Sequence, residues 1–106
     1  MHVMMIDNDG REREGEIENT LEALQAYVDG YIEVVPLTKQ ICVICNDEGK
    51  LKDLPVTAWL TARGGITALD TLCGPLIICR TTDDGEFADI QPGDTDEARL
   101  YVHSMK

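Results

Sequence analysis

Short apolar runs separated by turn-forming residues dominate the chain, and this pattern predicts a mainly β structure. Strands are expected over residues 3–6, 11–18, 31–37, 41–45, 50–54, 71–80 and 86–90. The segment 41–45 is apolar at almost every position, so it should be buried on both faces. In the preceding strand, Ile32 and Val34 should share one face, while Glu33 and Val35 share the other.

One segment has the spacing of an amphipathic helix. Leu21, Leu24 and Val28 recur at i, i+3 and i+7, which places them on one helical face. Asn19 is the expected N-cap, with Glu22 three residues later in the position that reaches back to it. Gly30 follows where a glycine commonly ends a helix.

The rest of the chain is less regular. Pro55 can open a helical turn in segment 55–67, and Gly64-Gly65 ends it. Gly74-Pro75 interrupts the strand over 71–80. A second helix is expected over 95–103, capped by Asp94 or Thr95.

These elements predict one α+β domain spanning residues 1–106. It should consist of a mostly antiparallel sheet of hairpins, with one or two helices packed on one face in two layers. The core is expected to include five apolar residues: Leu24, Val34, Val43, Ile77 and Cys79.

Charge is the unusual feature of the composition. Twenty Asp and Glu face nine Lys and Arg, giving a net charge of −11. Such a field repels phosphate, so we expect no direct binding of nucleic acid or of anionic membranes, and attraction to a basic partner protein. No apolar run approaches the roughly 20 residues that span a bilayer, and no secretory signal is visible. We therefore expect a cytoplasmic protein.

The four cysteines invite a zinc or disulfide interpretation. Cys42 and Cys45 have C-x-x-C spacing, but Val43 and Ile44 between them favour a strand, which points the two thiols to opposite faces. Cys73 and Cys79 lie six residues apart and form no second pair of this kind. Reduced core cysteines, with no metal and no cofactor, are the prediction.

No catalytic constellation is recognisable. The chain lacks phosphate-binding and zinc-protease motifs, and Ser104 is its only serine. Asp7, Asp9 and Gly10 suggest a calcium loop, but the glycine is fourth rather than sixth. His2 and His103 have no obvious partner and are expected on the surface. These absences favour a non-enzymatic protein.

Three predicted hairpin turns carry paired carboxylates. We expect these residues to bind the basic partner: Asp7 and Asp9, Asp47 and Glu48, and Asp83, Asp84 and Glu86. Turns that gather at one end of a sheet can present carboxylates in place of nucleic-acid phosphates. The alternative is that they only keep the turns solvated.

Several segments in order resemble a small family of unknown function, encoded mainly by phages and other mobile elements of Gram-positive bacteria. The segments are 20–25, 28–37, 46–51, Leu54-Pro55 and 74–78. The chain differs from this pattern at 56–59, where relatives often carry Asn-Arg, and from Asp94 onward.

This resemblance implies an accessory protein that acts on host machinery. With the acidic charge, it leads us to expect a stoichiometric inhibitor of a host nucleic-acid enzyme such as a nuclease, for example an anti-CRISPR or other anti-defence protein. One alternative is a pocket protein that sequesters a small nucleotide signal, for which Arg63 and Arg80 are the candidate phosphate ligands. Another is a structural accessory domain with no inhibitory role.

Overall fold

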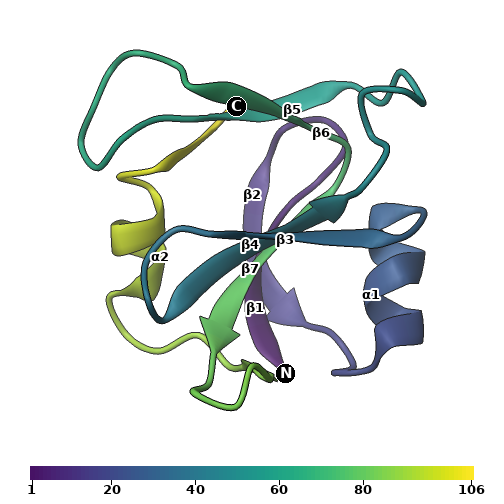
Figure 1. Cartoon of the computed structure of the whole chain (residues 1–106), viewed down its shortest axis with the longest axis vertical. Coiled ribbons are helices and arrows are strands. Elements are labelled where there is room, and N and C mark those ends of the chain that lie inside the picture. The colour runs from purple at the N-terminus through teal and green to yellow at the C-terminus, as the bar shows by residue number, and fades with distance from the viewer.

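The computed structural model describes all residues from 1 to 106 and contains two antiparallel sheets and two short helices (Figure 1). The main sheet has the order β2-β1-β7-β4-β3, with β8 paired to β7, and the second has the order β6-β5-β9. The elements are β1 (His2–Ile6), β2 (Glu12–Glu16), α1 (Leu21–Val28), β3 (Ile32–Pro36), β4 (Ile41–Asn46), β5 (Val56–Leu60), β6 (Asp70–Cys73), β7 (Leu76–Thr81), β8 (Phe87–Ala88), α2 (Asp94–Ala98) and β9 (Val102–Ser104). The predicted α+β class with mostly antiparallel strands is confirmed.

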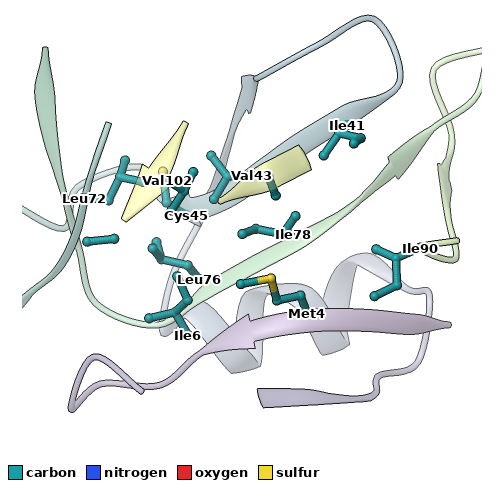
Figure 2. Packing of buried hydrophobic residues seen from close by; sticks show 12 residues of the cluster. Met4, Ile6, Ile41, Val43, Cys45, Leu72, Leu76, Ile78, Ile90 and Val102 are labelled. Atoms are coloured by element: carbon teal, nitrogen blue, oxygen red, sulfur yellow. The ribbon is translucent and has the colours of Figure 1, made fainter. Parts of the chain in front are cut away.

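The main sheet has apolar side chains on both faces and lies between two other layers. On one face, Leu24 and Val28 of α1 pack against side chains of β1, β4 and β7. On the other, Ala58, Leu72 and Val102 of the second sheet pack with Ala98 of α2 over the alternate residues of the same strands (Figure 2). Figure 1 shows α1 and α2 on opposite sides of the main sheet. The expectation of two layers was therefore wrong, because a second sheet forms the third.

Local sequence determines α1, but the cap lies one residue from the predicted position. Thr20, not Asn19, is the N-cap, and its Oγ1 accepts a hydrogen bond from the Ala23 amide at 3.2 Å. Asp29 takes the left-handed conformation (φ 63°) at the C-cap, and the Gly30 amide bonds to the carbonyl of Gln25. The sequence contains two adjacent residues able to cap, and only the backbone geometry distinguishes them.

Three predicted elements differ in the structure. Residues 50–54 form turns rather than a returning strand, and segment 55–67 contains strand β5 rather than a helical turn. The expected helix over 95–103 is short: α2 ends at Ala98, and the chain continues into β9. Strands β5 and β9 pair with each other, so pairing between distant segments outweighs the local pattern in the second and third cases.

Gly74-Pro75 does more than interrupt a strand, since it separates two strands of different sheets. Strand β6 pairs with β5 in the second sheet, whereas β7 lies at the centre of the main sheet. Gly74 has φ +79°, a conformation that favours glycine at this change of direction.

The predicted core is correct at four of its five positions. Leu24, Val43, Ile77 and Cys79 are buried, but Val34 is 42% exposed. Val34 lies on β3, the outermost strand of the main sheet, where no further strand covers it. Cys42 and Cys45 belong to opposite faces, as expected from their spacing, and all four cysteines are free and buried.

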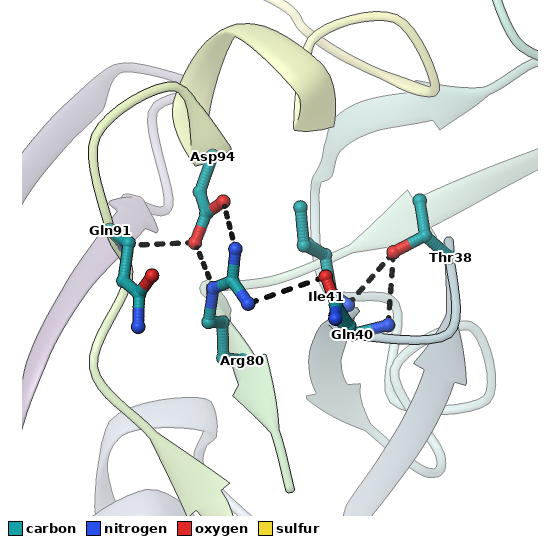
Figure 3. A network of polar contacts seen from close by, with 6 residues as sticks. All are labelled: Thr38, Gln40, Ile41, Arg80, Gln91 and Asp94. Carbon is teal, nitrogen blue, oxygen red and sulfur yellow. Dashed lines mark hydrogen bonds and ion pairs between the residues drawn. The ribbon is translucent and has the colours of Figure 1, made fainter.

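A nearly buried ion pair holds α2 against the main sheet (Figure 3). Arg80 of β7 donates two hydrogen bonds to Asp94 at 2.6 and 3.0 Å, and the Gln91 amide donates a third at 2.8 Å. Burial raises the pKa of Asp94, but the bonds from Arg80 and Gln91 outweigh it, so the pKa lies below its usual value. Asp94 therefore ties the start of α2 to the sheet.

Neither helix is long or apolar enough to cross a membrane.

Candidate protein-binding site: an acidic cleft beside the β3 edge

The strand registers separate the three acidic turns. Because β1 and β4 both run antiparallel to β7, the chain leaves both strands at the end where β7 begins. The turn carrying Asp7 and Asp9 and the turn carrying Asp47 and Glu48 therefore share one end of the main sheet. The turn carrying Asp83, Asp84 and Glu86 follows the last residue of β7, so it lies at the opposite end. The three turns do not form one surface.

Asp7 and Asp9 are engaged with neighbouring side chains. Asp7 accepts a hydrogen bond from Arg13 Nε at 3.1 Å and another from the Tyr27 hydroxyl at 2.8 Å. Asp9 pairs with Arg11 at 3.1 Å. Both carboxylates are thus largely neutralised within the chain.

Asp47 and Glu48 lie at the mouth of a cleft between the two sheets. Its volume is about 330 Å³, and its walls are β3, the end of β4, the turn after β4, Leu60 of β5 and strand β6. Four carboxylates and one cation line it, namely Glu33, Asp47, Glu48, Asp70 and Lys50. The fold brings these side chains together from β3, the turn after β4 and β6.

Buried Asn46 fixes the turn that presents these carboxylates. Its side-chain amide donates to the carbonyls of Val28 and Asp29, each at 2.9 Å, and its Oδ1 accepts from the Glu48 amide at 2.7 Å. Gly49 packs closely against β6, since a Cβ there would lie 3.0 Å from the Cys73 carbonyl oxygen. The end of α1 and the second sheet therefore both hold the turn in place.

The thiol of Cys45 lies beside the carboxylates of the cleft. Its Sγ lies 3.6 Å from Glu33 Oε1. Burial, the charge and hydrogen bond of Glu33, and the charges of Asp47 and Asp70 together raise the pKa of Cys45 to about 12. Lys50 offsets this field only in part, because its ammonium is bound to Asp70, whose pKa it lowers. The site as a whole favours a cation.

Most basic side chains are bound to carboxylates of the same chain. Six of the nine Lys and Arg residues form ion pairs, namely Arg11, Arg13, Lys50, Arg63, Arg80 and Arg99. Arg63 pairs with Glu97 at 3.3 Å, and Arg80 is held by Asp94. The two candidate phosphate ligands are therefore occupied, while the cleft carboxylates keep a surplus of negative charge.

The histidines have partners that their positions in the sequence do not reveal. His2 contacts Glu14 and Glu16 across the β1–β2 pair, and these contacts raise its pKa. His103 stacks on Trp59, with ring centroids 5.6 Å apart, and hydrogen-bonds Thr61 at 2.9 Å. His2 is 42% exposed, in line with the expected surface position, but sequence reasoning did not foresee the partners of either histidine.

No group of three or more His, Cys, Asp or Glu side chains is placed to hold a metal ion. The metal-free state stays a prediction, which elemental analysis of protein purified without chelator tests.

Sequence reasoning found Asp47 and Glu48 but missed three cleft residues. Glu33 reaches the cleft because it pairs with Cys45 across β3 and β4. Asp70 reaches it because β6 belongs to the second sheet, which the sequence did not predict, and Lys50 reaches it from the turn after β4, where its ammonium binds Asp70. Strand alternation in 31–37 did place Glu33 and Val35 on one face, and both line the cleft.

Comparison with known proteins places the chain in a family. Residues 1–103 match the family described as domain of unknown function (DUF3846). The chain belongs to the DUF3846 family. The match includes most of the segment after Asp94, which had seemed to lie outside the resemblance, so α2 and the first two residues of β9 lie within it. No curated protein and no solved structure matches the chain.

Proposed function

We propose that this DUF3846 protein is a non-enzymatic accessory protein of a phage or other mobile element of Gram-positive bacteria, and that it inhibits a host nucleic-acid enzyme. The proposed targets are defence enzymes, such as CRISPR effectors and other nucleases, which makes the protein an anti-CRISPR or other anti-defence protein. It acts in the bacterial cytoplasm by occupying a basic surface of the enzyme.

The acidic cleft is the observation that carries this proposal. Glu33, Asp47 and Glu48 form no ion pair, since Lys50 of the cleft is bound to Asp70, and Asn46 holds the turn that presents two of them. A channel that binds nucleic acid is lined by Lys and Arg, so it is complementary to fixed carboxylates. Because the carboxylates are already in place, little ordering entropy opposes the association.

The nucleotide-sequestering alternative has less support. It requires free basic side chains around a pocket, whereas Arg63 and Arg80 are bound to Glu97 and Asp94. The cleft also has the wrong sign for phosphate, with four carboxylates against one lysine.

A plasmid-interference assay in bacteria with an active CRISPR system, and a parallel assay with a restriction system, test the proposal. The cleft variant carries Glu33→Gln, Asp47→Asn and Glu48→Gln. The matched control carries Asp83→Asn, Asp84→Asn and Glu86→Gln, which removes the same charge at the other end of the sheet.

The wild-type protein and the control should suppress at least one defence system, and the cleft variant should not. All three should fold, because the substituted carboxylates are exposed. Full activity of a folded cleft variant contradicts the proposal. Failure of the wild-type protein to suppress any nucleic-acid defence favours the structural accessory alternative.

A further inference from the structure

The two edges of the main sheet differ in how they resist pairing with another strand. Edge strands are normally protected by charged side chains, because an open edge is a template for further pairing. Strand β2 follows this rule with the sequence Glu-Arg-Glu-Gly-Glu. Strand β3, Ile-Glu-Val-Val-Pro, has one charge, and Pro36 stands at its end. In Figure 1, β3 crosses the front of the molecule with the other strands of the sheet behind it.

The hydrogen bonds next to β3 show which of its backbone groups are unpaired. The Leu37 amide donates to Ile41, and the Asp47 amide donates to the Tyr31 carbonyl, each at 2.9 Å. Antiparallel pairs alternate between bonded and non-bonded residues, so Ile32 and Val34 direct both N–H and C=O away from β4. No hydrogen bond outside the sheet uses these groups. Pro36, which lacks an N–H, occupies the next outward position and offers only its carbonyl.

The two faces beside this edge have different chemistry. Val34 is exposed on the face that also carries α1. Glu33 and Val35 face the opposite side, where they line the acidic cleft with Asp47 and Glu48. A strand added to β3 therefore places alternate side chains over an apolar face and over a negatively charged face.

We infer that an extended segment of the partner protein, with alternating apolar and Lys or Arg residues, pairs with β3 and directs its basic side chains into the acidic cleft. Apolar residues lie opposite Ile32, Val34 and Pro36, and basic residues lie opposite Glu33 and Val35. Backbone hydrogen bonds to β3 set the register of the added segment, and the carboxylates of the cleft favour a segment with basic side chains. This inference deepens the proposed function and rests on it for the identity of the partner.

A second copy of the chain fits the edge less well. Pairing β3 with itself brings two acidic clefts together with no cation between them, and each chain carries −11. A segment of opposite charge removes that repulsion.

Titration with a short peptide tests the inference. The probe is a capped Val-Lys-Val-Lys-Val peptide. One control replaces its lysines with serine, and another N-methylates its central amide, which removes one donor. Amide exchange and NMR shifts report binding. We expect the probe to bind saturably and to protect the Ile32 and Val34 amides from exchange. Each control peptide should bind about tenfold more weakly or less well still.

Two protein variants distinguish the contribution of the Val34 backbone to binding from that of its side chain. Val34→Pro removes an outward N–H without breaking a hydrogen bond to β4. It should weaken binding of the probe about tenfold. Val34→Ala keeps the N–H and should change binding less than about threefold. If Val34→Pro does not fold, the N-methylated peptide tests the other hydrogen bond of the same residue pair, which the peptide N–H donates to the Val34 carbonyl.

Several outcomes overturn the inference: unchanged exchange at Ile32 and Val34 on adding the probe, equal binding of the N-methylated peptide, or a dimer of the free protein that Val34→Pro dissociates. Host-enzyme inhibition that survives Val34→Pro but fails in the cleft variant refutes strand pairing and leaves the proposed function standing. Probe binding at β3 without inhibition of any nucleic-acid enzyme refutes the proposed function alone.

Discussion

Asp94 illustrates how a single carboxylate serves structure rather than recognition. Only 7% of its side chain is exposed, and Arg80 and the Gln91 amide satisfy both of its oxygens. Its carboxyl group is thus stabilised in the charged form by the fold. The cleft carboxylates differ, since they remain exposed to solvent and to a partner.

Arg80→Gln should lower the free energy of unfolding by about 1–3 kcal/mol at neutral pH, because Asp94 loses its cationic partner but keeps the hydrogen bond from the Gln91 amide. Urea denaturation measures this cost. The pKa of Asp94 is depressed in the fold, so its contribution is present above the unfolded value near 3.9 and is lost as pH falls through the folded pKa. The difference in the free energy of unfolding between wild type and Arg80→Gln should therefore shrink on acidification. A difference that does not depend on pH contradicts the role given to the Arg80–Asp94 pair.

Leu24 and Val34 give a second comparison at this scale. Leu24 is 2% exposed between α1 and the main sheet, so Leu24→Ala should cost roughly 2–5 kcal/mol. Val34→Ala should cost less than about 0.5 kcal/mol, the usual surface range, because its side chain is largely free at the sheet edge. If Leu24→Ala and Val34→Ala lower the free energy of unfolding equally in chemical denaturation, the β3 edge is covered in solution.

The individual elements show what sequence patterns can predict. The spacing of Leu24 and Val28 gave the buried face of α1, and the apolar run 41–45 gave the central strand β4. The second sheet was not predictable, since Ala58 of β5 pairs with Ser104 near the C-terminus. Local propensity carries no information about so distant a partner.

The N-cap of α1 offers a direct test at the scale of one element. Thr20→Ala should destabilise the protein by about 1 kcal/mol, because the Ala23 amide loses its acceptor. Asn19→Ala should cost less than about 0.5 kcal/mol, since its exposed amide only donates to the Phe87 carbonyl. Thermal or urea unfolding measures the loss of stability in each variant. A larger loss for Asn19→Ala than for Thr20→Ala supports Asn19, the N-cap expected from the sequence.

At the scale of the whole molecule, two of the four cleft carboxylates could be predicted from the sequence. Asp47 and Glu48 were recognisable as a charged turn, but Glu33 and Asp70 join them only through the β3–β4 register and the second sheet. The antiparallel order of β1, β7 and β4 likewise sends Asp83, Asp84 and Glu86 to the far end. The basic partner that we propose rests on the charge count, whereas topology determines which carboxylates can act together.

The most direct test of the central claim is the affinity for the inhibited enzyme at two salt concentrations, with the wild type, the cleft variant and the far-end control. Between about 0.1 M and about 1 M salt the Debye length falls from about 10 Å to about 3 Å. The wild type and the far-end control should bind alike and weaken steeply with salt. The cleft variant should bind at least about tenfold more weakly at low salt and depend less on salt. Equal losses in the two triple variants, or tight binding by the cleft variant that salt does not change, contradict a function based on the acidic cleft.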